Sequence, residues 1–116
     1  ILGDYFGSRL MKNIREDKGY TYGISSAEAE LAKSGYFMIG TEVGSAQKDL
    51  AIQEIKNEIE RLQKDLVPDE ELELVRNYLL GQLLKSADGP YAMTDLFLSV
   101  DAYDLDFSFY ESIKKI

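Results

Sequence analysis

The 116-residue sequence contains no histidine and no cysteine. Protein zinc sites are built mainly from histidine nitrogen and cysteine sulfur, and a Ser-His-Asp triad or a Cys-His pair needs the same residues. The chain therefore excludes, within itself, a zinc centre and both of these catalytic arrangements. It also has no disulfide framework, which fits a reducing compartment without requiring one.

Long apolar runs are missing as well. The longest uninterrupted apolar stretches are a few residues long, whereas a membrane-spanning helix needs about 20. The composition, with 45% hydrophobic and 29% charged residues, is typical of a soluble globular domain, and the length allows at most one domain. No signal peptide is recognisable, but Ile1 is not a natural start, so the compartment stays open and both cytoplasm and periplasm are compatible.

Positive charge is scarce and unevenly placed. The net charge is −8, yet residues 1–23 carry four basic and three acidic residues, a net of +1, and the remainder carries nine and eighteen, a net of −9. Because so acidic a surface repels phosphate backbones, we expect no nucleic-acid binding. The exceptional segment contains "IREDKGYTYG", residues 14–23, which groups Arg15, Lys18, Tyr20 and Tyr22 around Gly19.

Hydrophobic periodicity predicts a helix, a β-hairpin and then three to four helices. Apolar residues at every fourth position predict a first helix from Leu2 to about Lys18, ending at Gly19. The runs "YTYGISS" and "YFMIGTEV", joined by "KSG", predict an antiparallel hairpin. Ser45 is the expected N-cap of a long helix whose apolar stripe runs from Ile52 to Leu66.

The remaining helices are marked by their first residues. Pro68, followed by several carboxylates, predicts the start of a second long helix, and Pro90 that of a third through roughly Val100. The segment "DLDFSFYESIKKI" predicts a further helix. The fold class is therefore α+β, an antiparallel sheet covered by helices.

The predicted sheet is too small to stand alone. A two-stranded hairpin is marginal, and its edges leave backbone groups unpaired. We therefore expect residues 1–116 to be part of a larger domain. We also expect the fragment to self-associate through the open edge or through uncovered helix faces.

Two other motifs have simple structural explanations. Gly3 and Gly7 form a GxxxG pattern, but the charges beside it argue against a membrane helix and favour close helix packing. The stretch "DAYDLDFSF" is similar to a calcium loop, but it fails at the third position or at the glycine position, depending on where the count begins. Its acidic residues are better explained as a helix-entry region.

Arg15 and Tyr22 are candidates for a site. Arg15 falls in the last turn of the predicted helix and Tyr22 about three residues into the predicted strand, so a turn at Gly19 would let their long side chains converge. In such a strand, Tyr20 and Tyr22 would share a face. The residues alone favour a structural explanation, because arginine suits a helix C-terminus and tyrosine suits a sheet.

The stretch "ILGDYFGSRLMKNIREDKGYTYGISS" resembles the pitrilysin/insulinase family of zinc peptidases. There, an "LGG…SRL…LRE…G.AY" pattern opens the later half of the non-zinc domain. The likeness continues through "SGYFMIGTEVG", "VPDEELELVRNYLLGQLL" and "DLDFSFYESI", and so covers essentially the whole chain. It implies that residues 1–116 are part of a non-zinc, C-terminal-type peptidase domain. A zinc-bearing domain or subunit with an H-x-x-E-H motif would complete a substrate chamber.

The resemblance also implies roles for individual residues. Arg15 and Tyr22, seven apart, match an arginine and a tyrosine that contact the peptide substrate near the scissile bond. Tyr20 stands where the family usually has a small apolar residue, so we interpret it as structural. No cofactor or metal is expected in this chain; zinc belongs to the partner domain or subunit. The fragment lacks the zinc motif, the first strands of its domain and the tail that follows, so we expect it to be inactive alone.

Two alternatives belong to other functional classes. Some members of this family are scaffolds without peptidase activity, as in respiratory-complex core subunits, and this chain could be one. The presence of both Arg15 and Tyr22 argues against that. A generic interaction module would be favoured only if the likeness were accidental.

Overall fold

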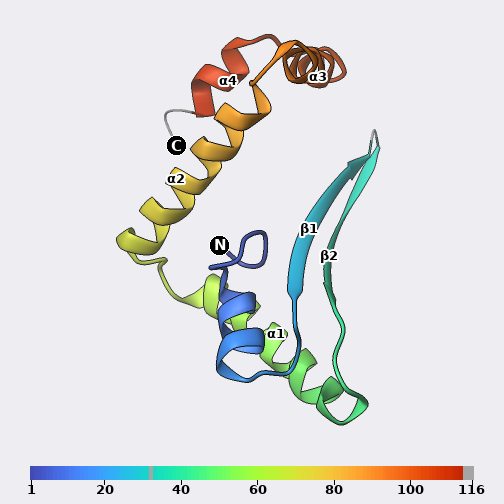
Figure 1. The fold of residues 1–116 in the computed structure, drawn as a ribbon, viewed down its shortest axis with the longest axis vertical. Coiled ribbons are helices and arrows are strands. Elements are labelled where there is room, and N and C mark those ends of the chain that lie inside the picture. Colours follow the sequence, from blue (N-terminus) through green and yellow to red (C-terminus); the bar gives the residue numbers. More distant parts are fainter. Residues whose placement is uncertain (32, 114–116) are drawn as a thin grey trace. The chain divides into compact units, whose positions relative to one another are not determined.

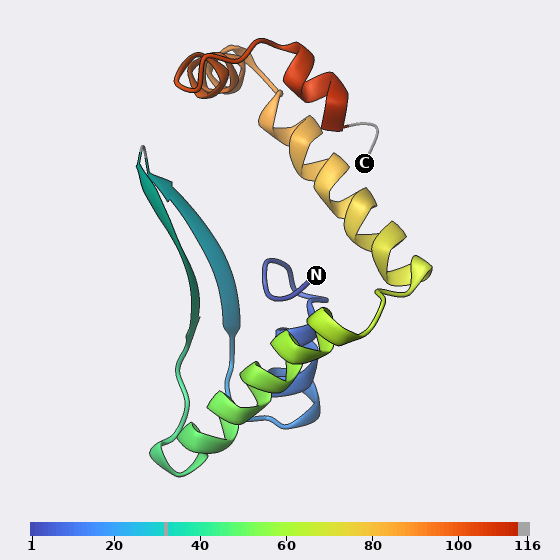
Figure 2. The same cartoon turned by 180° about the vertical axis from the view of Figure 1, so that it is seen from behind.

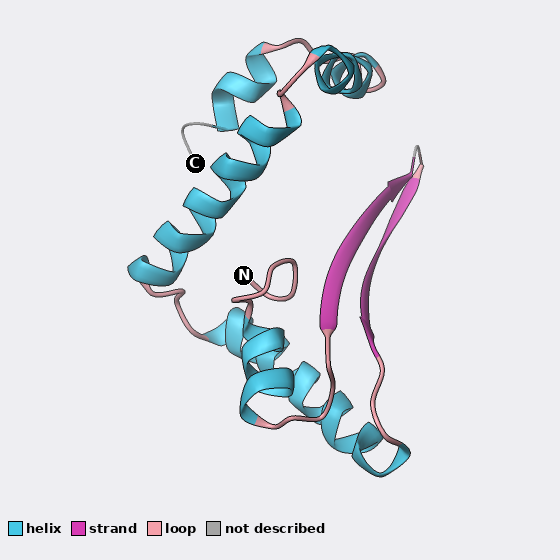
Figure 3. Ribbon diagram, viewed as in Figure 1, coloured by secondary structure: helices cyan, strands magenta, loops and turns pink. Residues whose placement is uncertain are grey.

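The structure is a computed structural model that describes residues 1–31 and 33–113. The chain divides into two compact units, Ile1–Pro68 and Asp69–Ile116, which are described separately. The first unit holds a helix, a hairpin and a long helix, and the second holds helices (Figures 1 and 3). The predicted α+β class and the predicted order of elements are confirmed.

The first helix is shorter than predicted. It is η1, Met11–Asp17, a π-helix. Arg9 and Leu10, which come directly before it, are also helical, whereas residues 1–8 form a loop (Figure 1). The prediction of a helix from Leu2 was therefore wrong. The backbone N–H of Leu10 donates to the Leu2 carbonyl at 2.9 Å. This eight-residue separation closes a loop rather than a helical turn.

Gly3 explains why the loop runs where it does. Its carbonyl accepts a hydrogen bond from the backbone N–H of Ser26 at 2.8 Å. A Cβ atom at Gly3 would lie 2.8 Å from that same nitrogen, so the close approach of the loop to the hairpin needs glycine. The predicted close packing at the GxxxG motif is thus a contact between a loop and a strand, not between helices.

The strands form the predicted hairpin with a later start. Strand β1, Ile24–Leu31, pairs antiparallel with β2, Ser34–Thr41, from Ile24↔Thr41 to Leu31↔Ser34. Tyr22 therefore precedes the strand, and its predicted place inside the strand was wrong. The Thr21 hydroxyl donates to the Glu42 backbone carbonyl at 2.7 Å, so a side chain, not the sheet ladder, holds this segment.

The long helix α1, Lys48–Lys64, follows a 3-10 turn, η2, Ser45–Gln47. Ser45 is the first residue of that turn and makes no capping hydrogen bond, so its prediction as the N-cap was wrong. The predicted apolar stripe of α1 is buried only in part: Ile55 packs against the core, and Ile59 and Leu62 are half-buried. Ala51 and Glu58 are buried on α1, whereas Ile52 is exposed.

A small core joins these elements. Leu10, Ile14 and Ile24 are buried together. Partly buried side chains from η1, β2, α1 and the connecting segments pack against them: Leu2, Met11, Tyr20, Ile39 and Ile55. Figures 1 and 2, seen from opposite sides, both show α1 beside η1. This core fixes η1 against the base of the hairpin, where the candidate site lies.

The second unit confirms the predicted helices. It contains α2, Asp69–Ser86; α3, Pro90–Asp101; and α4, Ser108–Ile113. Pro90 opens α3. Before α4, the Ser108 hydroxyl and backbone N–H, both hydrogen-bonded to Asp106, lower the pKa of that carboxyl. The predicted end of this last helix, residues 114–116, lies outside the described residues.

Candidate functional site

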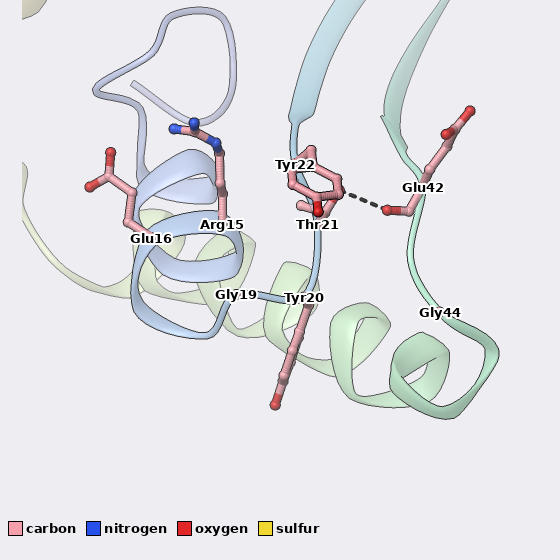
Figure 4. A pocket seen from close by; sticks show the side chains of 8 residues that line it. All are labelled: Arg15, Glu16, Gly19, Tyr20, Thr21, Tyr22, Glu42 and Gly44. Carbon is pink, nitrogen blue, oxygen red and sulfur yellow. Dashed lines mark hydrogen bonds between the residues drawn. The ribbon is translucent and has the colours of Figure 1, made fainter.

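A hollow of about 580 Å³ lies where η1 ends and the chain approaches β1 (Figure 4). Its lining comes from the η1 terminus, from the segment that precedes β1 and from the segment that follows β2. The lining residues are Arg15, Glu16, Gly19, Tyr20, Thr21, Tyr22, Glu42 and Gly44. The structure thus brings both sequence-predicted site residues into one hollow.

Gly19 turns the chain between the two candidates. Its φ of +63° is the left-handed conformation predicted for the end of the helix. The backbone N–H of Gly19 donates to the Arg15 carbonyl at 3.1 Å. Because the turn is tight, a residue on η1 and a residue seven positions later face the same space.

Arg15 is half-buried in the last turn of η1. Its guanidinium carbon lies 4.6 Å from the centroid of the Phe6 ring, a cation–π distance. Within residues 1–31 and 33–113 its guanidinium makes no hydrogen bond or ion pair. All of its N–H donors are therefore available to a ligand.

Tyr22 is 99% exposed, and its ring borders the hollow. The described part of the chain offers its hydroxyl no hydrogen-bond partner. A second hollow of about 500 Å³ shares Tyr22 and extends along the base of the hairpin past Ser25 and Gly40. Tyr22 thus stands between two open spaces with its donor free.

Tyr20 and Tyr22 do not share a face, contrary to the prediction. Tyr20 is half-buried and packs against the Leu10–Ile14–Ile24 core. Figure 4 shows its ring directed away from Arg15 and Tyr22, which lie on the other side of the chain. The alternation rule failed because it applies to strands, and both tyrosines precede β1.

A polar network that sequence reasoning missed anchors η1 to α1. The Asn13 amide donates to Glu54 Oε2 at 3.2 Å and to Glu58 Oε1 at 2.7 Å. Lys18 forms an ion pair with Glu54 at 3.4 Å. Glu58 is only 7% exposed. The spacing of Glu54 and Glu58, one helical turn apart, was a signal that could have been noticed.

The arrangement can bind oxygen acceptors. A guanidinium and a phenol, both without hydrogen-bond partners among the described residues, can donate to carbonyl oxygens or to a developing oxyanion. Nothing in residues 1–31 and 33–113 groups three or more potential metal ligands. Nor is any helix there long and apolar enough to cross a membrane.

These features define an α+β domain with an open, donor-rich hollow at a helix–hairpin junction. Residues 1–79 match the model of a family described as "Peptidase M16 inactive domain". The chain belongs to this family, and the predicted relation to pitrilysin/insulinase-type zinc peptidases is confirmed.

Two similar proteins are described as uncharacterized zinc proteases. One, YmxG of Bacillus subtilis, is 30% identical over 88 residues, which cover 76% of this chain and 22% of that protein. The other, from Rickettsia bellii, is 34% identical over 83 residues, which cover 72% of this chain and 20% of that protein. The chain therefore matches about a fifth of the length of these relatives.

A solved structure supports the same assignment. The crystal structure of a peptidase M16 inactive domain from Pseudomonas fluorescens superposes with a TM-score of 0.87 at 25% sequence identity. The match covers 99% of this chain and 27% of that one. The similarity thus extends through both units of the chain.

Proposed function

We propose that residues 1–116 are part of the non-zinc, C-terminal-type domain of a zinc-dependent peptidase. In this proposal, Arg15 and Tyr22 bind the backbone of a peptide substrate near the scissile bond. The observation that carries it is that both side chains line one open hollow and that their donors have no hydrogen-bond partner among the residues that the structure describes. Membership in the M16 inactive-domain family supplies the peptidase context.

The chemistry of peptide hydrolysis suits these two side chains. Attack on the scissile carbonyl places negative charge on its oxygen. The Tyr22 hydroxyl can donate one hydrogen bond to that oxygen, and the Arg15 guanidinium can donate to the same or to a neighbouring carbonyl. These donors matter most if they bind the transition state more tightly than the substrate.

The metal would come from outside this chain. With no histidine or cysteine, its residues do not fit a peptidase zinc site. A zinc-bearing domain or subunit would supply the ion, which activates a water molecule for attack. The role left to this chain is to hold and polarise the substrate. The fragment by itself should bind no stoichiometric zinc and cleave no peptide.

The proposal is tested in the full-length protein together with its zinc-bearing domain or subunit. We expect Tyr22→Phe to lower kcat by about 10²–10³, the usual cost of losing one oxyanion donor. Arg15→Ala should cost at least as much, with part of the loss in KM if the guanidinium also holds the bound substrate. Steady-state cleavage of a fluorogenic peptide measures both.

Tyr20→Phe is the matched control. It removes the same hydroxyl from a ring two residues away that packs against the core, so kcat should change little. The melting temperature should stay nearly constant in both tyrosine variants. Equally small losses at the two tyrosines would overturn the catalytic role and favour the alternative of a non-catalytic scaffold.

A further inference from the structure

We propose that Phe6 is a positioning residue for Arg15. Its ring would hold the guanidinium at the hollow without occupying any of the N–H donors. This inference rests on the proposed function of Arg15 and adds a residue from a different segment of the chain.

The contact has the geometry of a cation–π pair. The guanidinium carbon lies 4.6 Å from the ring centroid, within the roughly 6 Å over which the ring quadrupole attracts a cation. Phe6 is 64% exposed, so the ring is not placed there by core packing. This exposed ring lies against the Arg15 guanidinium.

The loop that carries Phe6 is fixed on both sides. Before Phe6, the Gly3 carbonyl accepts the Ser26 N–H of β1 at 2.8 Å. After it, the Ser8 N–H donates to the Tyr5 carbonyl at 3.0 Å, and Ser8 itself is buried. The backbone that carries Phe6 is thus held by hydrogen bonds to the hairpin and within the loop.

A ring suits this task better than a carboxylate would. A carboxylate partner would accept N–H groups of the guanidinium and would compete with a substrate carbonyl for them. An aromatic ring attracts the cation through its quadrupole and accepts no conventional hydrogen bond. The arginine is therefore restrained in advance, and all five of its donors stay free for the substrate.

The test uses the full-length protein with its zinc-bearing domain or subunit. We expect Phe6→Leu to lower kcat/KM by about 2- to 5-fold, the range for an exposed cation–π pair. Phe6→Tyr, which keeps the ring, should restore the wild-type value. In an Arg15→Ala background, Phe6→Leu should have no further effect, because no guanidinium remains to be positioned.

A direct structural measurement accompanies the kinetics. With arginine selectively labelled, NMR should show the Arg15 side-chain protons shifted by the Phe6 ring current. The shift should vanish in Phe6→Leu and persist in Phe6→Tyr. Phe37→Leu is the matched control, because Phe37 has a similar exposure of 55% but lies on β2, paired with Glu28. It should change neither the shift nor kcat/KM.

The outcomes separate the two proposals. An Arg15 shift that is the same in wild type and in Phe6→Leu overturns the contact. A shift that vanishes while kcat/KM stays constant, with Arg15→Ala impaired, overturns the positioning role alone. If Arg15→Ala is itself unimpaired, the proposed function fails, and with it the reason to position Arg15, whatever the shift shows.

Discussion

At the scale of single residues, Gly19 decides how the candidate site is assembled. Its positive φ lets the chain leave η1 and return toward the hollow. Both tyrosines after this turn border the hollow, but Tyr20 is partly buried and packs against the core, whereas Tyr22 is almost fully exposed. The turn at Gly19 thus leads to different degrees of burial for Tyr20 and Tyr22, although they are only two positions apart.

We predict that Gly19→Ala destabilises the protein by roughly 1 kcal/mol. A Cβ atom there would meet no atom within 4 Å, so the cost is the left-handed backbone conformation alone. Urea unfolding measures it. Gly81→Ala is the control: that Cβ would also meet no atom within 4 Å. Because Gly81 lies inside α2, alanine should raise stability slightly. An equal gain at both glycines would contradict the proposed role of the turn.

At the scale of elements, hydrogen bonds from Asn13 to two glutamate carboxylates, one of them buried, join η1 to α1. Glu58 lies on the buried face of α1, and Asn13 on η1 donates to it. The same amide reaches Glu54, which also pairs with Lys18. These contacts restrain η1 in rotation and position, and η1 carries Arg15. The network therefore supports the site without lining the main hollow.

We predict that Asn13→Ala lowers the free energy of unfolding by about 1–3 kcal/mol. The substitution removes the donor from a buried carboxylate oxygen and leaves that oxygen without its partner. Gln53→Ala is the comparison, because Gln53 donates to Asn57 at 3.0 Å on the exposed side of α1, the helix that also carries Glu58. Its effect should stay within about 0.5 kcal/mol. Similar effects for both variants in urea unfolding would show that the Asn13 network is not important for stability.

At the scale of the whole molecule, the hairpin leaves backbone and apolar surface open. Within the described residues the sheet has two strands. Several large apolar side chains of the hairpin are exposed: Leu31, Tyr36, Phe37 and Met38. Exposed strand edges with apolar side chains are prone to pair with other chains.

We predict that the 116-residue chain self-associates in a concentration-dependent way. Sedimentation velocity should show species larger than the monomer at high protein concentration. Phe37→Lys should shift the distribution toward monomer, because a lysine on an edge strand opposes pairing. A single sharp monomer peak for the unsubstituted chain at high concentration would refute this prediction.

Local patterns in the sequence determined a large part of this protein. Hydrophobic periodicity, together with the turn and helix-start residues Gly19, Pro68 and Pro90, located the helices and the hairpin. Such signals depend on the backbone conformation of only a few neighbouring residues. The pattern of SRL, RE, Gly19 and Tyr22 indicated the peptidase family, and the same pattern selected Arg15 and Tyr22 as candidates. Their presence in one hollow was therefore predictable; their role in catalysis stays a prediction.

Only the tertiary structure decided the rest, because it depends on contacts between residues far apart in sequence. The hydrogen bond from Asn13 to Glu58 spans 45 positions, and the spacing of Glu54 and Glu58 on α1 does not indicate which residue they bind. Residues 1–8 form a loop, held to the hairpin by the hydrogen bond from the Ser26 N–H to the Gly3 carbonyl, although their apolar spacing favoured a helix. That loop placed Phe6 against Arg15. Local propensity is weak compared with such long-range contacts, and the contacts prevailed.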